Sequence, residues 1–313
     1  MTESSPPRVT IGLPVFNGEN FLTSALRSLA GQDYPNLHIV IGDNGSTDAT
    51  PQICKEFAAS NANVTYLRSP ENRGAAWNYN RLLDHAEGDY FKWQAHDDMC
   101  APTLVSQCVD ALERDPAVVV AYPQTALIDT EDAVVGEMDD DMDLADATAH
   151  ARLRRFLSIQ TEYHPVFGVI RLDALRQTGL IGPYIGSDVV LLAELAMRGE
   201  FREVAGRLFL RRFHDQTSWH ANTGEDSLAT WFDPANAGRV AMPVSRMSTE
   251  LVKSVWAADL PTTERVRCLR AVAGTWMLPR WRYIGGECKR AVRLTARRRL
   301  RPSDRPRTGS GED

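Results

Sequence analysis

The first hundred residues alternate between short apolar runs and segments whose apolar residues recur at helical spacing. Four runs have the β-branched and aromatic content of strands, at residues 8–14, 37–41, 64–67 and 90–94. Between the first two runs, the apolar residues from Leu22 to Leu29 fall on one face of a helix. Consecutive parallel strands need crossover connections, which are right-handed almost without exception. The alternation therefore predicts an α/β fold with a mostly parallel, Rossmann-like central sheet flanked by helices.

Polar loops follow these strands, and in such a fold they gather at the edge of the sheet where ligands bind. The fourth strand ends in two adjacent acids, Asp97 and Asp98. Neighbouring carboxylates repel each other and resist burial unless a cation or a hydrogen-bond network neutralises them. An isolated pair of acids is more often a solvated turn. The pair becomes a candidate site if the sheet brings further polar loops beside it, namely Phe16 with Asn17, Asp43 with Asn44, and residues 72–74.

The overall charge and the cysteines exclude several classes of protein. A net charge of -6 argues against a nucleic-acid-binding protein, because neutralising phosphates requires a basic surface. Residues 1–7 lack the features of a signal peptide, and no later stretch has the apolar length of a membrane span. The five cysteines are odd in number and include no Cys-x-x-Cys pair. These features predict a cytoplasmic protein with reduced thiols.

Four polar motifs occur in a fixed order along these strands. They are Pro14-Val15-Phe16-Asn17, Gly42-Asp43-Asn44-Gly45-Ser46-Thr47-Asp48, Asn72-Arg73-Gly74 and His96-Asp97-Asp98. In this order they resemble the loops of the family 2 glycosyltransferases, which have the GT-A fold. The resemblance extends to about Trp219, and it favours a functional acid pair over a solvated turn. Ala95 departs from the pattern, because the family commonly has a further Asp at that place.

The resemblance implies a nucleoside-diphosphate sugar as donor, with a UDP- or dTDP-sugar expected. Asp43 would hydrogen-bond the nucleotide base, Phe16 would contact that base, and Asp97 would lie near the ribose and the donor sugar. Asp98 would ligate a divalent metal. Magnesium or manganese suits oxygen ligands and would offset the charge of the leaving diphosphate. The remaining donor contacts implied by the motifs are Pro14, Asn17, Asn44, Asn72, Arg73 and Gly74.

The second half of the chain would supply the catalytic base. Asp188 matches the Asp of the family's Glu-Asp motif, although Ser187 stands in place of the Glu. The resemblance implies an inverting transfer, in which this carboxylate takes the proton of the attacking acceptor hydroxyl. Either residue would also suit the start of a helix without any catalytic role.

Two further segments resemble the acceptor and diphosphate parts of the family's cleft. His164 would contact the acceptor, although a lone His beside Pro is more often structural. Residues 211–219 resemble the family's Tyr-Arg-x-His segment, so His214 would reach the metal or the diphosphate. Arg211 or Arg212 could add positive charge at the phosphates, and Trp219 would offer its face to a sugar ring.

An acidic stretch lies between these motifs. It runs from Glu131 to Asp146 and holds eight acids without any Lys or Arg. The acids lack the regular spacing of a calcium loop, so the sequence predicts a solvated acidic loop.

The chain ends in a helical extension beyond the resemblance, residues 241–313. Residues 280–307 hold eleven Lys or Arg against two acids, interleaved with Trp281 and Tyr283. A basic amphipathic segment of this kind can lie on an anionic membrane surface, and a solvated tail is the equal alternative. The helices of the extension would either complete the acceptor cleft or form a homodimer interface.

These predictions combine into one leading function and two alternatives. Residues 1–100 would form the nucleotide-sugar-binding half of a GT-A domain and residues 101–240 its acceptor-binding half. The leading function is an inverting, metal-dependent glycosyltransferase that makes a cell-envelope glycan, a glycolipid or a specialised metabolite. A sugar-phosphate nucleotidyltransferase is the second candidate, but its basic Gly-rich opening loop is missing here. A non-catalytic sugar-binding module is the third, because Ala95 and Ser187 replace acids of the usual pattern.

Overall fold

The computed structural model describes residues 5–159, 162–214, 222 and 224–300, and Trp219 lies outside these ranges. The strands are β1 (Val9–Val15), β2 (Leu37–Asp43), β3 (Val64–Arg68), β4 (Tyr90–Trp93), β5 (Met99–Cys100), β6 (Val118–Ile128), β7 (Val134–Met138), β8 (Val169–Arg171) and β9 (Glu200–Arg212). The α-helices are α1 (Leu22–Ala30), α2 (Thr50–Ser60), α3 (Ala75–Arg81), α4 (Leu104–Arg114), α5 (Ala149–Ser158), α6 (Leu172–Arg176), α7 (Ser187–Arg198), α9 (Glu225–Phe232), α10 (Pro243–Ala257), α11 (Thr262–Ala271) and α12 (Trp281–Leu300).

The first four strands form the predicted parallel sheet. Their order is β3-β2-β1-β4, with Val15 opposite Asp43 and Gly12 opposite Trp93. Because all four strands run in the same direction, the loops after β1, β2 and β4 emerge at one edge, as the alternation of apolar runs predicted. The sequence boundaries of these strands agree with the structure to within about two residues.

The second half of the chain extends the same sheet with mixed strand directions. β8 joins β4 in antiparallel orientation, β6 follows β8, and β9 pairs with β6 in parallel. β5 and β7 add antiparallel pairs to β9 and β6. The predicted α/β class with a GT-A-like sheet flanked by helices is confirmed. The division of the chain at residue 100 stays a prediction, since the sheet runs through both halves.

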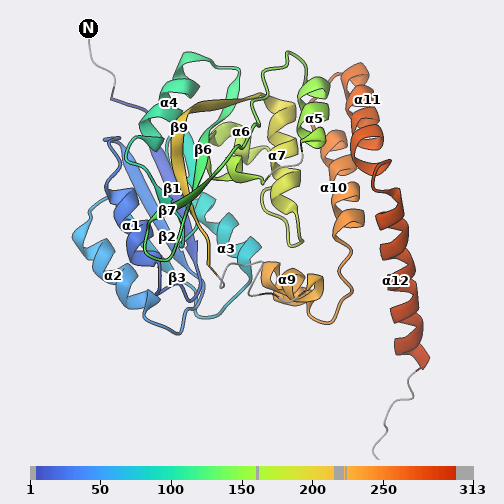
Figure 1. Cartoon of the computed structure of the whole chain (residues 1–313), viewed down its shortest axis with the longest axis horizontal. Coiled ribbons are helices and arrows are strands. Elements are labelled where there is room, and N and C mark those ends of the chain that lie inside the picture. The colour runs from blue at the N-terminus through green and yellow to red at the C-terminus, as the bar shows by residue number, and fades with distance from the viewer. Residues whose placement is uncertain (1–4, 160–161, 215–221, 223, 301–313) are drawn as a thin grey trace, which may run out of the picture.

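Helices cover both faces of this sheet (Figure 1). On one face, α1 and α4 pack against the inward residues of β1, such as Ile11 and Leu13. On the other face, α3, α5 and α7 pack against Phe91, Trp93 and Tyr122. α7 is apolar on nearly every side and is buried between the sheet and α10, so it is fixed firmly in place. The residue that starts α7 is therefore held rigidly relative to the strand ends.

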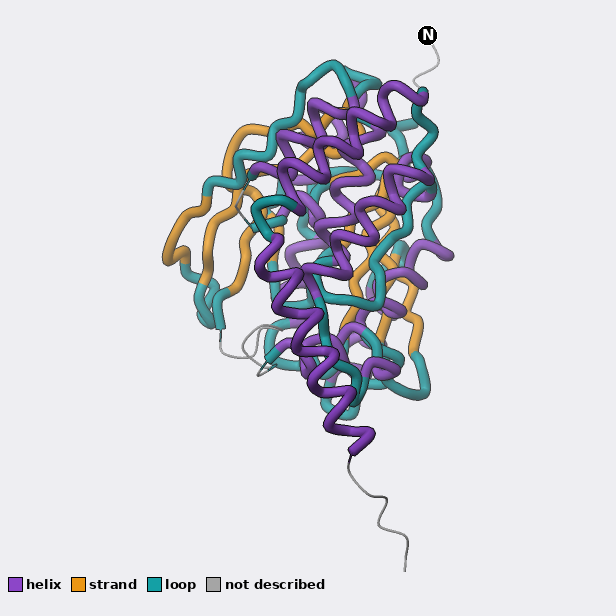
Figure 2. Tube along the Cα trace, turned by 90° about the vertical axis from the view of Figure 1, so that its right-hand side faces the viewer, coloured by secondary structure: helices purple, strands orange, loops and turns teal. Residues whose placement is uncertain are grey.

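The C-terminal helices form an outer layer beyond α7. A π-helical stretch (Val272–Met277) connects α11 to the short turn that precedes α12. Figures 1 and 2 show α12 at the outer edge of the molecule, with its last turns extending beyond the neighbouring helices. Within the described part of the chain, no helix is both long and apolar enough to cross a membrane.

The prediction of a solvated acidic loop between Glu131 and Asp146 is wrong in part. Residues 134–138 form β7, which pairs with β6. Asp140 and Met142 have no exposed surface, and Leu144 bridges to Phe201 of β9. The number of acids did not reveal this strand or the buried residues after it. Apolar residues between the acids are buried in the core, and Asp140 is buried with them.

Candidate functional site

The loops after β1 and β2 are joined directly to each other. The backbone N–H of Asn17 donates to Ser46 Oγ at 2.9 Å, and Asn17 Oδ1 accepts from the backbone N–H of Thr47 at 2.9 Å. Asn17 has a positive φ of 50°, which an Asn tolerates better than most residues. Phe16 remains 38% exposed at the tip of this loop, so its ring is free to contact a ligand.

Asp43, the predicted base contact, is completely buried at the end of β2. Its Oδ1 accepts from the backbone N–H of Ser46 at 2.8 Å, and its Oδ2 accepts from the Tyr66 hydroxyl at 2.8 Å. Arg68 lies 3.4 Å from the same Oδ2. Burial and the Asp43 carboxylate both raise the pKa of Tyr66. Asp43 therefore anchors the loop in this structure, and its contact with the base stays a prediction.

Asn44 connects the second motif to the third. Its Nδ2 donates to Asn72 Oδ1 at 2.9 Å and to the Gly74 carbonyl at 3.1 Å, while its Oδ1 accepts from the Arg73 N–H at 3.1 Å. Gly74 needs to be glycine, because its φ is 86° and a Cβ there would approach the Phe232 carbonyl to 2.6 Å. The structure thus brings Asn44, Asn72, Arg73 and Gly74 together, as the order of the motifs predicted.

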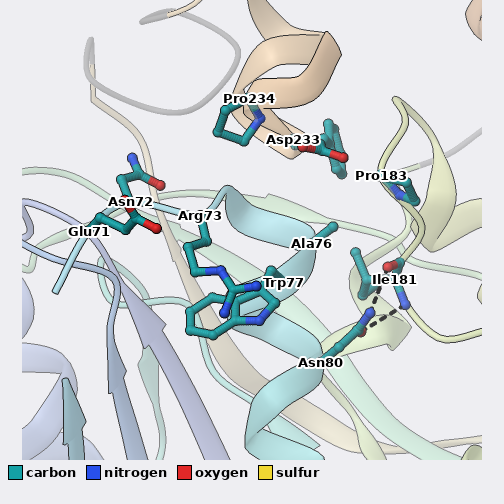
Figure 3. Close-up of a pocket in the computed structure, with 11 residues that line it drawn as sticks. Glu71, Asn72, Arg73, Ala76, Trp77, Asn80, Ile181, Pro183, Asp233 and Pro234 are labelled. Atoms are coloured by element: carbon teal, nitrogen blue, oxygen red, sulfur yellow. Dashed lines mark hydrogen bonds between the residues drawn. The ribbon is translucent and has the colours of Figure 1, made fainter. Parts of the chain in front are cut away.

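A cavity of about 540 Å³ opens beside this third loop (Figure 3). Its floor is Trp77 of α3, and the guanidinium groups of Arg73 and Arg81 lie 4.2 Å and 4.5 Å from the indole ring centre. Asn80 hydrogen-bonds both backbone groups of Ile181 and so fixes the loop before α7 to α3. Arg73 lines the cavity, and a guanidinium beside an indole ring suits an anionic or planar ligand.

The acid pair after β4 is mostly enclosed. Asp98 is 6% exposed, and its Oδ1 accepts from the backbone N–H of Arg212 at 2.8 Å. Burial, followed by the neighbouring charge of Asp97, raises the pKa of Asp98. Burial opposes ionisation of Asp97 as well, but the charges of His96 and His214 outweigh it and lower the pKa of Asp97. The two carboxyl groups therefore differ, since Asp97 favours its ionised form whereas Asp98 without a cation is held toward its neutral form.

The residues around the acid pair suit a hard divalent cation. His214 Nε2 lies 3.0 Å from Asp97 Oδ2, so the two predicted metal residues, Asp98 and His214, flank the same carboxylate. Within the described ranges, no three His, Cys, Asp or Glu side chains converge as a complete metal cage. One or two carboxylates completed by phosphate oxygens is how magnesium is usually held in phosphate-binding sites. The donor set fits a metal that arrives with a diphosphate.

The predicted base, Asp188, is half-buried at the start of α7. Burial is the main cause that raises its pKa, and the charge of Glu162 raises it further. Ser187, which replaces the family's Glu, is fully buried, and its Oγ has no hydrogen-bond partner among the residues described. Glu162 thus supplies an acid near Asp188 from a different element.

One tyrosine connects the two sides of the site. The carboxylates of Asp97, Asp98 and Asp188 all act on Tyr79 of α3, and together with burial they raise the pKa of its hydroxyl. The sequence placed these three acids in separate motifs, and the charge of each one reaches this hydroxyl. A carboxylate that accepts a proton and a separate acidic cluster that holds a cation can serve one transfer reaction.

Other predicted residues have clear structural partners. His164 is buried, and each of its ring nitrogens contacts protein side chains, so its contact with an acceptor stays a prediction. The Arg212 side chain is also buried and bonded to Asp97, Asp129 and Asp132. Pro14 lies within β1, two residues before Phe16 of the first loop.

Sequence reasoning missed Tyr66, Tyr79 and Glu162. Tyr66 and Arg68 alternate along β3 beside Asp43, so strand alternation could have identified that pair. Tyr79 lies one turn after Ala75 on α3, in a position that periodicity marks only as inward-facing. Glu162 carries no signal of its own, because its place beside Asp188 comes from the fold.

The chain was compared with known protein families and proteins. A model of glycosyl transferase family 2 matches residues 10–176, just over half of the chain. The putative glycosyltransferase EpsE of Bacillus subtilis is 31% identical over 112 residues, 36% of this chain and 40% of EpsE. Glycosyltransferase GlyA of Streptococcus pneumoniae is 37% identical over 91 residues, 29% of this chain and 13% of GlyA. The chain thus spans two fifths or less of these curated relatives.

Two solved structures have a similar fold. Residues 1–349 of S. aureus TarS, solved with UDP-GlcNAc, superimpose with a TM-score of 0.62 at 16% identity, covering 86% of this chain and 72% of that one. The mannosyltransferase PcManGT of Pyrobaculum calidifontis, solved with GDP-Man and Mn2+, gives 0.56 at 19% identity, covering 93% and 75%. At these identities the likeness concerns the fold.

Proposed function

The chain belongs to glycosyl transferase family 2, and we propose that it transfers a sugar from a nucleoside-diphosphate sugar to an acceptor hydroxyl with inversion at the anomeric carbon. The observation that carries the proposal is the enclosed acid pair after β4, where the Arg212 N–H donates to Asp98 Oδ1 at 2.8 Å and His214 Nε2 lies 3.0 Å from Asp97 Oδ2. This acid pair and a separate carboxylate, Asp188 at the start of α7, suit a reaction in which one group stabilises a leaving diphosphate and another activates a hydroxyl.

In the proposed mechanism, the residues divide the work between leaving group and nucleophile. Asp188 accepts the proton of the acceptor hydroxyl as that oxygen attacks, and its raised pKa brings it closer to the range of an effective base. Asp98 and His214 would hold a magnesium or manganese ion, which supplies positive charge to the departing diphosphate when bound, and Asp97 would lie near the ribose and the donor sugar. Arg73, beside Trp77, is placed to contact the donor from the third loop.

A UDP- or dTDP-sugar is the proposed donor. TarS and PcManGT, which share the fold, were solved with UDP-GlcNAc and GDP-Man, so a nucleoside diphosphate attached to a sugar is common to both. The proposed acceptors are a cell-envelope glycan, a glycolipid or a specialised metabolite. The nucleotidyltransferase alternative is not favoured, because the family match covers the donor motifs.

The donor can be found by thermal shift with a panel of nucleotide sugars, including UDP-, dTDP- and GDP-linked sugars, with and without manganese. A ligand that binds only the folded state at about 100 times its Kd adds roughly 2.7 kcal/mol of stability, so the melting temperature of the correct complex should rise by several degrees. The donor found should then release free nucleoside diphosphate when acceptors are added. Binding without release for every acceptor tried would favour the sugar-binding module.

We also propose that α12 brings the enzyme to an anionic membrane surface. Its inner side is fixed, since Glu287 accepts from the backbone N–H groups of Val244 and Ser245, and Arg290 pairs with Glu225 at 2.6 Å. Trp281 and Val292, which lie on the opposite side, are 60% and 69% exposed. The spacing i, i+7 and i+11 puts Trp281, Cys288 and Val292 on one face of the helix, and Cys288 is exposed as well.

Charge makes a lipid surface the best match for this face. Arg282, Lys289 and Arg293 flank the apolar stripe. Residues 280–307 carry eleven Lys or Arg and two acids, whereas the rest of the chain carries 24 Lys or Arg and 39 acids. Each cation near anionic headgroups contributes about 1 kcal/mol. A predominantly acidic protein would thus be oriented with α12 toward the lipid.

Vesicle flotation tests the membrane proposal. The full chain should float with phosphatidylcholine vesicles only when they contain phosphatidylglycerol. Changing Arg282, Lys289 and Arg293 to Glu should weaken this binding by roughly 100-fold or more, since three favourable charges are reversed. The pair Trp281→Ser and Val292→Ser should weaken it too. The matched control is Val134→Ser with Val135→Ser on β7, where the side chains are equally exposed, at 63% and 59%.

The result that contradicts the membrane proposal is equal flotation of the wild type and the charge-reversed variant. A change from dimer to monomer on substituting Trp281 and Val292, without any flotation of the wild type, would assign the same face to a homodimer instead.

A further inference from the structure

A buried chain of polar contacts connects the acidic stretch to the rim of the candidate site. Asp140 has no exposed surface, and its Oδ1 lies 2.7 Å from His164 Nδ1. The same nitrogen is 2.9 Å from Thr125 Oγ1. On the other side of the ring, His164 Nε2 lies 3.1 Å from an Nη atom of Arg211. Four segments, namely β6, the loop after β7, the turn at His164, and β9, are thus joined through one imidazole.

The contacts define how the imidazole is protonated. Asp140 offers only acceptor oxygens, so Nδ1 must carry the hydrogen that points to it. The Arg211 guanidinium offers only donors, so Nε2 must present its lone pair. His164 is therefore a neutral ring that donates to Asp140 and accepts from Arg211. A second oxygen of Asp140, Oδ2, is buried and has no hydrogen-bond partner among the described residues.

This arrangement is costly if its only purpose is stability. A buried carboxylate with one oxygen unpaired loses hydration that a single hydrogen bond does not fully replace. An apolar residue at position 140 would fit the surrounding core, which includes Met142 and Leu144. Buried polar chains of this kind give a side chain one fixed orientation. The last side chain in this series of contacts is that of Arg211.

Arg211 lies where the two sides of the candidate site meet. The next residue, Arg212, donates its backbone N–H to Asp98 Oδ1 at 2.8 Å, and an Nη atom of Arg211 is 3.4 Å from Glu162. Glu162 in turn acts on Asp188. The neighbouring Arg212 cannot serve the same purpose, because its side chain is buried and bonded to Asp97, Asp129 and Asp132. The Arg211 side chain is 31% exposed, so part of its guanidinium remains accessible to a ligand.

We propose that Asp140 and His164 are positioning residues that orient Arg211 toward the diphosphate of the donor. The proposal rests on the proposed glycosyl transfer and deepens it by naming the cation that contacts the phosphates. Arginine suits this task because its planar group binds phosphate oxygens through two parallel hydrogen bonds. His164 then acts on the donor through Arg211 and not by contact with the acceptor.

Nucleotide binding by the full chain tests this proposal. Isothermal titration with UDP, dTDP and GDP, each with manganese, gives the diphosphate affinity, and UMP, dTMP and GMP give the contribution of the nucleoside and its first phosphate. Arg211→Met should weaken diphosphate binding by roughly tenfold or more, because a charge-assisted contact is lost, and should leave monophosphate binding almost unchanged. His164→Leu should act in the same direction. Since both changes remove the same contact, the double variant should be little weaker than Arg211→Met alone.

Two further variants separate positioning from folding. His164→Gln offers a side-chain oxygen that can still accept from Arg211, so it should recover part of the affinity that His164→Leu loses. Arg207→Met is the matched control, because Arg207 lies four residues earlier on β9 and pairs with Glu137 and Asp139 of the same acidic stretch. It should leave diphosphate affinity unchanged. Melting temperatures of all variants identify any that are unfolded.

The possible outcomes separate this proposal from the proposed function. Wild-type diphosphate affinity in Arg211→Met would overturn the phosphate contact. The positioning role would be overturned if Arg211→Met weakens diphosphate binding but His164→Leu does not. It would also be overturned if the two losses add fully in the double variant. If Arg211→Met weakens diphosphate and monophosphate binding equally, Arg211 does not contact the second phosphate, and its assignment as the diphosphate contact is overturned. If the wild type binds none of UDP, dTDP and GDP, the donor site itself fails and the proposal falls with it.

Discussion

Replacing Asp188 by asparagine is expected to lower the turnover number for sugar transfer by roughly 10²–10⁴-fold while donor affinity stays close to that of the wild type. Asparagine has the same shape and keeps an oxygen that can accept from the Val189 N–H at the start of α7, but it cannot take a proton. The loss should therefore appear in kcat and not in the donor Kd. Ser187→Ala is the matched control on the same helical turn, since the Ser187 hydroxyl has no partner in the described structure. Near-normal turnover by the asparagine variant would remove Asp188 from the mechanism.

The pH profile gives an independent check on this base. A carboxylate acts as a base only when ionised, so kcat should rise with pH as Asp188 loses its proton. Burial and Glu162 raise the pKa of Asp188, which places this rise above the usual range of an aspartate. Glu162→Gln removes one negative charge and lowers the pKa of Asp188, so the rise should move to lower pH. A rise that stays at the same pH would show that another group titrates.

The donor side of the fold was predictable because short-range patterns determine it. Strand alternation and loop order placed Asp43, Asn44 and Asn72 at one edge, and parallel pairing of β1 with β2 and β4 produces that edge. The pattern could not predict which hydrogen bonds these side chains make. Asp43 is held by Tyr66 and Ser46, contacts that depend on the spacing of two strands.

The acceptor side was less predictable because distant segments build it. The sequence shows His164 beside a proline, but the side chains that its ring contacts, Asp140 and Arg211, lie 24 and 47 residues away in the sequence. The sequence marked Asp140 as one acid among eight, with nothing to distinguish a buried acid from solvated ones. Likewise, Glu162 comes near Asp188 only through the packing of α7 against the sheet. Such contacts follow from tertiary structure, and a single sequence without its fold carries no periodic signal for them.

Asp98→Asn is expected to abolish the contribution of manganese to nucleoside-diphosphate binding and to lower transfer by roughly 100-fold or more. The substitution is conservative for the fold, since the asparagine Oδ1 can still accept from the Arg212 N–H, which Asp98 Oδ1 binds at 2.8 Å. It removes a carboxyl whose ionisation is opposed by burial and by the charge of Asp97, so the variant without metal should melt at the same temperature as the wild type or higher.

The metal dependence separates this role from a purely structural one. Chelation with EDTA should reduce the diphosphate affinity of the wild type to that of Asp98→Asn, and added manganese should restore only the wild type. The control is Asp110→Asn on α4, an exposed acid paired with Arg114, which should respond to manganese as the wild type does. A full manganese effect in Asp98→Asn would show that Asp97 and His214 hold the metal without Asp98. Because Asp97 is already paired with His214 at 3.0 Å, a cation there would have to replace that contact, whereas Asp98 can offer its second oxygen without breaking any bond to Arg212. For this reason Asp98 is the stronger candidate for the metal ligand.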